Sequence, residues 1–362
     1  MHAVPGLFDP LTIRGLTIPN RVAMSPMCMY RSEDDGQPTD WHLIHLGSRA
    51  AGGVGLVITE ATAVAEEGRI TPGDLGLWSD TQISGHRRIV NAVREFGAVA
   101  GVQLSHSGRK GGRSRPWDGN TPLPSSQWGK TLAPSPIPFK PEWQQPTEMT
   151  HADIAQVIDS FAAATRRARD AGYQVVEGHF AHGYLMHQFL SPFSNRRTDE
   201  YGGGLENRAR LPLAVAHAIR DEWPSELPVF MRLSLVDWIP GGVNLEESIQ
   251  VAAWMREMGI DLIDGTSSGI IPGETIPEAP LYHLDMSRRL RAEAGIATSA
   301  VGRVRTAQEA SRALSSEGAD LVLVGRAMLQ DAYWARHAAR DLEEGNRVEV
   351  PVQYRRATQH LS

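Results

Sequence analysis

The chain alternates between short, almost wholly apolar runs and longer stretches that mix apolar and polar residues. The short runs are rich in β-branched residues, a pattern typical of parallel strands that are buried on both faces. We therefore expect eight strands: Arg21–Met24, Val54–Ile58, Val99–Leu104, Gln174–His179, Val229–Ser234, Leu262–Asp264, Ala297–Val301 and Leu321–Val324.

The stretches between these runs carry signals for helix starts and ends. Ser, Thr or Asn followed three residues later by Gln, Asp or Glu is typical of an N-cap, which satisfies the free N–H groups of the first turn. The expected caps are Ser79 (with Gln82), Thr150 (with Asp153), Thr306 (with Glu309) and Asn244. Glycine, which favours helix C-termini, follows several helical stretches directly before the next strand: Gly97, Gly172, Gly259, Gly295 and Gly318.

Eight strand–helix units predict one (β/α)8 barrel spanning residues 1–362. An open, doubly wound sheet is the alternative, but no GxGxxG motif follows the first strand, which argues against a dinucleotide-binding fold. Residues 105–149 interrupt the alternation of strands and helices, and they contain eight of the 23 prolines and three tryptophans. A segment of that length after the third strand is expected to form a folded lid, with a small hairpin, over the barrel mouth.

Composition narrows the class of protein further. A net charge of −6 with 22% charged residues argues against a nucleic-acid-binding polycation. No apolar stretch approaches the roughly 18 residues that would span a bilayer, and the N-terminus lacks a signal-peptide pattern, so a cytoplasmic protein is expected. Cys28 is the one cysteine, which excludes an intrachain disulfide and a four-cysteine iron–sulfur or zinc site.

Residues at the carboxyl ends of barrel strands converge on one mouth, where barrel enzymes build their active sites. The expected strand ends carry Ser25, Pro26, Met27, Cys28, Glu60, Ala61, Gln103, His179, His182, Tyr184, Arg232, Ser267, Ser268, Val301, Gly302, Gly325 and Arg326. Carboxylates are scarce in this set, whereas metal-dependent hydrolysis and glycoside cleavage depend on them. We therefore expect no metal, although a zinc hydrolase built on His179 and His182 is kept as an alternative.

Two features of the mouth indicate specific chemistry. Gly302 and Gly325–Arg326 could bind a phosphate through backbone N–H groups and a guanidinium, or could simply form tight turns. His179 and His182 can both face the mouth only if their strand ends near Phe180, because residues three apart on a strand face opposite sides. Tyr184 beside them favours a catalytic role over a structural one.

The order of several motifs resembles the Old Yellow Enzyme family of FMN-dependent ene-reductases, in particular its bacterial branch that includes xenobiotic reductase. The resemblance spans nearly the whole chain. Its motifs are Leu7-Phe8-x-Pro10, Asn20-Arg21-x-x-x-Ser25-Pro26-Met27-Cys28, Glu60-Ala61-Thr62, Gln103-Leu104-x-His106-x-Gly108-Arg109-Lys110, His179-x-x-His182-Gly183-Tyr184-Leu185, Ser194-Asn195-x-Arg197-x-Asp199-x-Tyr201-Gly202-Gly203 and Val324-Gly325-Arg326.

The resemblance implies that FMN lies across the barrel mouth. Its phosphate would bind Gly302, Gly325 and Arg326, and its ring would lie against Pro26, Met27 and Ala61. Ser25 and Val301 are further residues expected to contact the cofactor. Arg232 would approach the N1/C2 end of the ring, where reduced flavin carries negative charge. Gln103 would bind the pyrimidine edge. Cys28 would lie near N5 and tune the flavin potential.

The implied reaction transfers hydride from NADPH or NADH to FMN and then to an activated alkene, such as an enone, a maleimide or a nitro compound. His179 and His182 would bind the substrate oxygen, Tyr184 would donate the proton, and Tyr30 would contact the substrate. A phenol suits that step because it stays protonated at neutral pH. Phe193 in place of a frequent histidine, and Gly178 before His179, depart from the family pattern and affect the expected shape of the pocket.

The tail, residues 344–362, contains Pro351-Val352-Gln353-Tyr354 followed by Arg355 and Arg356. In the similar branch, an arginine at the position of Arg356 reaches the active site of a neighbouring subunit. A homodimer or a dimer-built tetramer is therefore expected, with packing of the tail on its own barrel as the alternative. Arg355 replaces a frequent acidic residue, and the two arginines could compete for the role.

Of three other functions, one is excluded and two stay open at this stage. Dienoyl-CoA reductases and amine dehydrogenases share the barrel, but the single cysteine excludes their iron–sulfur cluster. A barrel that binds FMN as a flavin carrier or sensor is compatible with every motif named above. The metal-dependent hydrolase would require ligands in addition to His179 and His182.

Overall fold

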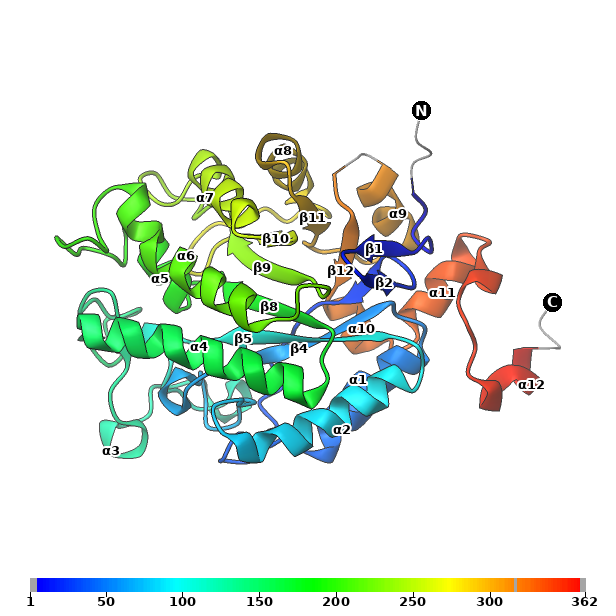
Figure 1. Cartoon of the computed structure of the whole chain (residues 1–362), viewed down its shortest axis with the longest axis horizontal. Helices are drawn as coiled ribbons and strands as arrows, with labels where there is room; N and C mark the ends of the chain where they lie inside the picture. Colours follow the sequence, from blue (N-terminus) through cyan, green and yellow to red (C-terminus); the bar gives the residue numbers. More distant parts are fainter. Residues whose placement is uncertain (1–4, 316–317, 359–362) are drawn as a thin grey trace.

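The computed structural model describes residues 5–315 and 318–358. Eight parallel strands close into a barrel in the order β10-β11-β12-β3-β4-β5-β8-β9 (Figure 1). The strands are β3 (Val22–Met24), β4 (Leu56–Ala63), β5 (Val99–Ser105), β8 (Val175–Phe180), β9 (Val229–Ser234), β10 (Leu262–Thr266), β11 (Ala297–Ala300) and β12 (Leu321–Val324). The prediction of a single (β/α)8 barrel is confirmed, and the doubly wound sheet is excluded.

Helices surround the barrel as an outer layer (Figure 1). They are α1 (Asp40–Ala51), α2 (Ile83–Arg94), α4 (His151–Ala171), α6 (Leu205–Glu222), α7 (Leu245–Glu257), α8 (Leu284–Ala294), α9 (Ala307–Ser315) and α11 (Trp334–Asp341). The short helices α5 (Leu185–Leu190) and α10 (Arg326–Gln330) follow β8 and β12 directly. All four expected N-caps form, at Ser79, Thr150, Asn244 and Thr306.

The amino end of the barrel is filled and closed. Apolar residues occupy its interior, among them Leu56, Val175 and Phe230. A hairpin of β1 (Leu11–Ile13) and β2 (Leu16–Ile18) packs on the same cluster, a feature that the sequence pattern did not predict. Because this end is plugged, only the carboxyl end of the barrel can open to a ligand.

Among the strands, β4 departs most from its predicted end, whereas the ends of β5, β8, β10 and β11 differ by one or two residues. β4 continues past Ile58 to Ala63, with a register shift against β5 between Ile58 and Ala61. A bulge of this kind redirects the side chains that follow it. The buried strand can therefore contain polar residues such as Glu60. Ala61 therefore reaches the mouth from within the strand rather than from its end.

The segment 105–149 folds over the carboxyl end of the barrel as η3 (Gly108–Lys110), η4 (Pro116–Asp118), α3 (Ser125–Trp128), β6 (Leu132–Ala133) and β7 (Thr147–Glu148). β6 and β7 pair in parallel, whereas an antiparallel bridge joins Arg113 and Pro122 earlier in the segment, where a small hairpin was expected. The Arg197 guanidinium donates to the carbonyls of Pro134 and Met149, so it ties both of these short strands to the loop after α5.

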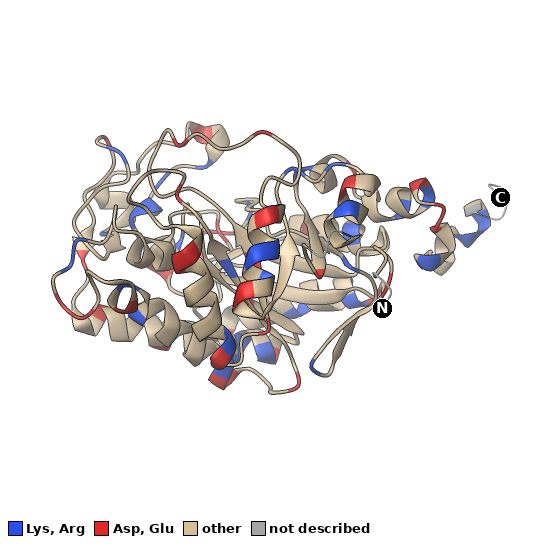
Figure 2. Cartoon of the chain, turned by 90° about the horizontal axis from the view of Figure 1, so that it is seen from above, with Lys and Arg blue, Asp and Glu red and all other residues tan. Residues whose placement is uncertain are grey.

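The chain after α11 first packs on the barrel, where Val348 is buried in the core, and then extends away from it. It contains η5 (Gly345–Arg347), η6 (Val352–Tyr354) and α12 (Arg355–Thr358), and Figures 1 and 2 show α12 projecting at one end of the molecule. Val352 is 65% exposed, and Arg356 is exposed as well. Residues 359–362 of the predicted docking tail lie outside the described residues.

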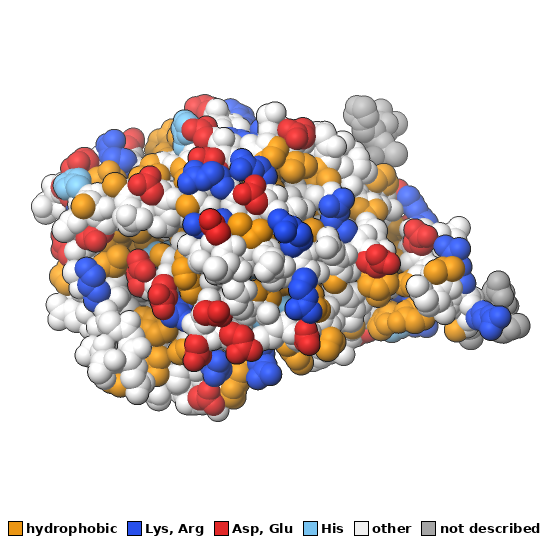
Figure 3. Space-filling model, turned by 60° about the horizontal axis from the view of Figure 1, so that its bottom comes forward, with side chains coloured by type: hydrophobic (Ala, Val, Ile, Leu, Met, Phe, Trp, Pro, Cys, Tyr) orange, Lys and Arg blue, Asp and Glu red, His pale blue; other side chains and the backbone are white. Residues whose placement is uncertain are grey.

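The surface carries charges of both signs side by side on the face that Figure 3 shows, as the modest net charge implies. Exposed ion pairs of the molecule include Arg289–Glu293 and Arg88–Asp40. Among the described residues, none of the helices has the length and apolar character that a membrane span requires.

Candidate active site

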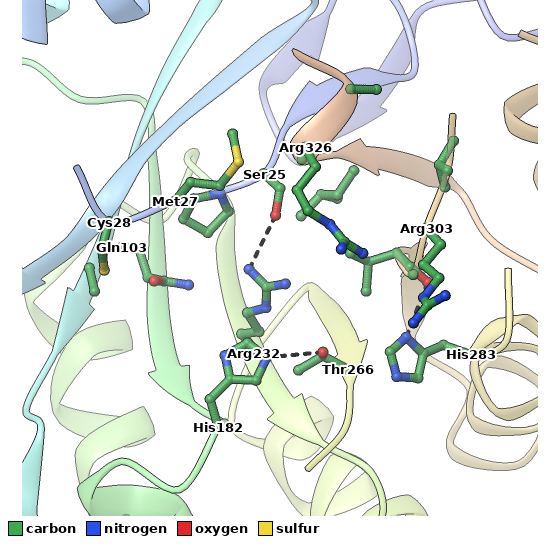
Figure 4. Close-up of a pocket in the computed structure, with 18 of the residues that line it drawn as sticks. Ser25, Met27, Cys28, Gln103, His182, Arg232, Thr266, His283, Arg303 and Arg326 are labelled. Atoms are coloured by element: carbon green, nitrogen blue, oxygen red, sulfur yellow. Dashed lines mark hydrogen bonds between the residues drawn. The ribbon is translucent and has the colours of Figure 1, made fainter. Parts of the chain in front are cut away.

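A cavity of about 690 Å³ opens at the carboxyl end of the barrel (Figure 4). Nearly all of the predicted site residues line it: Ser25, Pro26, Met27, Cys28, Ala61, Gln103, His179, His182, Tyr184, Arg232, Val301, Gly302, Gly325 and Arg326. Tyr30 and Arg356 do not line it. The residues come from seven of the eight strands, so the closed sheet fixes their relative positions.

The end of β8 brings three side chains together. β8 ends at Phe180, which is the condition for both histidines to face the mouth. The chain then turns at His182 and Gly183, whose φ angles are +56° and +70°. The rings of His182 and Tyr184 lie 5.1 and 5.0 Å from the ring of His179. His182 Nε2 is 3.1 Å from Thr266 Oγ1 on β10. The three groups therefore face one region of the cavity.

The hydrogen bonds assign the tautomers of this pair. His179 Nδ1 accepts from the Ala181 N–H at 3.3 Å, which leaves the proton of the neutral ring on Nε2. His179 Nε2 lies 3.4 Å from His182 Nδ1, so His182 in turn carries its proton on Nε2. Burial, followed by the charge of Arg232, holds the pKa of both histidines well below the usual value. Both are thus neutral N–H donors.

The turn at His182 and Gly183 is held by hydrogen bonds to His187, a residue that the sequence analysis did not single out. His187 Nδ1 accepts from the Gly183 N–H at 2.8 Å, and its Nε2 lies 2.9 Å from Asp237. Ser191 and the Val243 amide also donate to Asp237. Burial opposes ionisation of Asp237, yet these donors hold its pKa below the ordinary value. This network fixes the turn that carries His182 and Gly183 without lining the cavity.

Lys110 reaches the same region from the segment 105–149. Its ammonium donates to the carbonyls of His182 and Gly269 at 2.8 and 3.0 Å and lies 5.2 Å from the centre of the Tyr184 ring. Burial lowers the pKa of Lys110 to about 7. Burial also raises the pKa of Tyr184, so its phenol keeps its proton at neutral pH. The sequence motif contained Lys110, but only the fold shows that it faces Tyr184.

Below the mouth, the barrel interior is polar. Arg232 Nε lies 3.1 Å from Asp264 Oδ2, and Arg232 Nη1 donates to Ser25 Oγ at 3.3 Å. The ion pair lacks hydrogen-bond alignment, since neither Arg232 Nε nor Asp264 Oδ2 has a hydrogen-bond partner among the described residues. Beside it, Gln103 Nε2 donates to Glu177 Oε1 at 2.7 Å. Two carboxyl groups thus lie directly behind a mouth that the sequence indicated to be poor in them.

The opposite end of the cavity is formed by backbone N–H groups and arginine side chains. Gly302 adopts φ +113°, and a Cβ there would lie 2.8 Å from His283 Nδ1. None of the hydrogen bonds found among the described residues uses the N–H of Gly302, Arg303 or Gly325 as its donor. Arg303 and Arg326 line the same end (Figure 4). Free amides beside two guanidinium groups form a site for a phosphate, and Arg303 is a member that sequence reasoning missed.

Cys28 and Tyr30 follow β3 at the edge of the cavity. Glu60 holds this loop, because its carboxylate accepts from the Met29 N–H at 2.8 Å and lies 3.2 Å from His42 Nε2. Burial raises the pKa of the Cys28 thiol well above 9, so Cys28 is a neutral group. Tyr30, at φ +52°, contacts Trp117 with ring centres 6.1 Å apart, which places it where segment 105–149 meets the mouth.

A metal centre finds little support in the side chains of the cavity. Within the described ranges 5–315 and 318–358, the one group of three possible ligands is His151, Asp199 and Glu200. That group lies outside the cavity, and Asp199 already binds the Arg197 guanidinium. His179 and His182 are therefore not joined by a third ligand of this kind.

A barrel with unpaired amides and arginines at one end of its mouth, and a fixed arginine and neutral histidine donors at the other, suits a flavin-dependent oxidoreductase. Comparison with known proteins agrees: residues 6–345 match the model of the NADH:flavin oxidoreductase / NADH oxidase family. The chain belongs to this family, the Old Yellow Enzyme family, and is an oxidoreductase of the NADPH dehydrogenase type.

Individual relatives support the assignment over nearly the full length. The NADPH dehydrogenase of Geobacillus sp. (strain WCH70) is 44% identical over 351 residues, which cover 97% of this chain and 98% of the relative. Among solved structures, morphinone reductase matches with a TM-score of 0.79 and 28% identity, over 94% of this chain and 90% of that one. The Old Yellow Enzyme homologue from Zymomonas mobilis matches with a TM-score of 0.77 and 26% identity, over 93% of each chain.

Proposed function

We propose that this NADPH dehydrogenase binds FMN and reduces the C=C bond of activated alkenes, such as α,β-unsaturated carbonyls, maleimides and nitro compounds. The observation that carries the proposal is the convergence of two neutral histidine donors and the Tyr184 phenol on one cavity. Donors of this kind polarise a substrate oxygen, and a phenol beside them can supply a proton.

The cavity fits FMN at both of its ends. The unpaired amides of Gly302 and Gly325, with Arg326, suit the phosphate. Gln103, whose Nε2 is engaged by Glu177, offers its carbonyl to an N–H such as that of the flavin pyrimidine edge. The fixed charge of Arg232 suits the ring position where reduced flavin is negative. Ser25, Pro26, Met27, Cys28, Ala61 and Val301 complete the walls.

Bound FMN supplies a hydride acceptor for NADPH or NADH and a hydride donor for the alkene. The protein's own residues bind the substrate and supply the proton. His179 and His182 exchange their present contacts with His182 Nδ1 and Thr266 Oγ1 for the carbonyl or nitro oxygen, to which each donates its Nε2–H. Tyr184 holds the proton that adds to the α-carbon. Lys110, 5.2 Å from the Tyr184 ring, stabilises the phenolate that remains. Tyr30 and Trp117 limit the pocket on the side of segment 105–149, which serves as its lid.

The tail is proposed to complete the site of a second copy of the chain. Since residues 352–357 are exposed and α12 projects from its own barrel (Figure 2), Arg356 is available to a neighbouring pocket rather than to its own. A homodimer, or a tetramer built from such dimers, follows from this proposal. A cytoplasmic location also follows, because NADPH is a cofactor of that compartment.

The direct experiment compares the two half-reactions. Under nitrogen, NADPH should bleach the flavin of the purified protein, and an enone should restore its colour. A protein whose reduced flavin no alkene reoxidises would instead be a flavin carrier or sensor, and a colourless protein that holds zinc would be a hydrolase.

A further inference from the structure

Four polar side chains form a layer inside the barrel, directly under the cavity. They are Gln103 on β5, Glu177 on β8, Arg232 on β9 and Asp264 on β10, and all four are buried. In the strand register Gln103 lies opposite Glu177, and Arg232 lies opposite Asp264. Gln103 and Arg232 line the cavity, whereas the two acids do not. The layer thus places one cation above two carboxyl groups.

Glu177 is the member of this layer to which the proposed reaction gives no role. Its side chain is fully buried, and its Oε1 accepts from Gln103 Nε2 at 2.7 Å. Its Oε2 has no hydrogen-bond partner among the described residues. A buried carboxyl group with one free oxygen is costly unless it stays protonated or serves a purpose, so its presence in the barrel needs an explanation.

We propose that Glu177 is a positioning residue that acts on the flavin through Gln103 and Arg232. It fixes the orientation of the Gln103 amide, and its protonation state sets how strongly the positive charge of Arg232 acts on the flavin ring. This inference rests on the proposed binding of FMN. It concerns the residue's control of flavin reduction and not the alkene step.

The first part of the proposal follows from hydrogen-bond direction. An amide has one donor and one acceptor end, and Glu177 takes the donor end of Gln103. The carbonyl of Gln103 is then the end left to face a flavin N–H. Without the carboxyl group the amide could rotate by half a turn and present the wrong end.

The second part follows from charge. Arg232 is already paired with Asp264 at 3.1 Å. An ionised Glu177 would add a second negative charge beneath the ring and oppose the negative charge of reduced flavin. Burial, with the nearby Asp264 charge, raises the pKa of Glu177 to about 8, so the group is mostly neutral at pH 7. Flavin reduction adds a further negative charge and favours the protonated form more strongly.

The proton balance gives a measurable consequence. Two electrons and one proton convert oxidised flavin to its singly charged reduced form. Above about pH 8 a second proton is expected to bind the Glu177 carboxylate on reduction. The midpoint potential of the bound flavin should therefore fall with pH about twice as steeply above pH 8 as it does near pH 6.

The other groups that face this layer do not produce the same signal. His179 lies on the same strand and, like His182, has a pKa well below the usual value, so neither titrates above pH 7. Arg232 and Asp264 remain paired. Lys110, beyond the histidines, has a pKa lowered to about 7, and it is unchanged in a Glu177 variant. A variant at Glu177 therefore separates its proton from that of Lys110.

The test measures the flavin midpoint potential and the protons taken up per flavin reduced, between pH 6 and pH 9, in the whole protein. Glu177→Gln keeps the shape and the acceptor for Gln103 but cannot ionise, so it should give the single-proton slope throughout. Glu177→Leu removes the acceptor as well and should weaken FMN binding about tenfold. Ser299→Ala is the control: it loses a buried hydrogen bond to Asp264 but should keep the steeper slope.

Equal slopes above pH 8 in the wild type and in Glu177→Gln would overturn the proposal. If a variant did not fold, proton uptake by the wild type alone would test the proposal. Uptake of only one proton per flavin reduced at every pH would contradict the role of Glu177. Failure of the proposed function would look different: the protein would hold no reducible flavin, or no alkene would reoxidise its reduced flavin, whatever the slope of the potential with pH.

Discussion

At the scale of single residues, the Tyr184 hydroxyl is the group that separates the two half-reactions. Tyr184→Phe removes only the proton donor, so flavin reduction by NADPH should be unchanged while alkene reduction slows about tenfold or more. General acid catalysis is typically worth ~10²–10⁴ in rate, and water can replace part of it. Stopped-flow measurement of each half-reaction checks this, and an equal fall in both would make Tyr184 a structural residue.

The histidine pair should bind the substrate oxygen through both Nε2–H groups, which then leave His182 Nδ1 and Thr266 Oγ1. Replacing His179 and His182 by alanine removes both donors, so phenolic ligands such as 4-hydroxybenzaldehyde should no longer produce a charge-transfer band with the flavin. His217→Ala, at an exposed histidine paired with Asp221 on α6, is the matched control and should bind normally. An unchanged dissociation constant in the double variant, with FMN retained, would remove the pair from the substrate site.

At the scale of elements, the turn between β8 and α5 is the most constrained part of the site. Gly183 has φ +70°, and a Cβ there would lie 1.9 Å from the Gly269 carbonyl oxygen. Gly183→Ala should therefore lower the free energy of unfolding by at least about 2 kcal/mol more than Gly97→Ala. Gly97 has φ +79° with open space around its Cβ position, so it shares the backbone strain but not the clash.

Denaturant unfolding of the two variants measures this difference. If Gly183→Ala and Gly97→Ala lose the same stability, the turn moves freely and does not fix the positions of His182 and Tyr184. Loss of activity in Gly183→Ala without any loss of stability would likewise show that its backbone position matters only for the substrate.

The strands and caps could be predicted because their signals are local. β9 and β12 have the bounds that their apolar runs indicate, and the side chain of Thr150 caps α4 at the expected residue. Hairpin β1–β2 and the parallel pair β6–β7 were missed, because strands of two or three residues are stabilised by distant contacts. The end of β4 depends on a bulge that no apolar pattern reveals.

The site was predictable where residues stand at strand ends, since the barrel brings those ends together. Lys110, Arg303 and the His187–Asp237 pair were missed for a different reason. Each reaches the site through the path of a loop or short helix, and that path depends on tertiary contacts rather than on local sequence. Glu177 stands within a predicted strand, and its place behind Gln103 follows only from the register of β5 and β8.

At the scale of the whole molecule, the projecting tail makes activity depend on assembly. Arg356→Ala should raise the KM for an enone while the FMN content and the oligomer size stay intact, because it removes one substrate contact from the neighbouring pocket. Arg355→Ala should do less, since Arg355 binds Glu349 within the tail. Steady-state kinetics with sedimentation analysis checks both, and full activity in a strictly monomeric preparation would contradict the role across subunits.

The central claim is that one cavity binds FMN and passes hydride from NADPH to an activated alkene. An anaerobic titration of the purified protein tests it most directly. We expect a yellow protein with one FMN per chain, bleached by one equivalent of NADPH and restored by one equivalent of an enone. A protein without flavin, or a reduced flavin that no enone, maleimide or nitro compound reoxidises, would contradict the account.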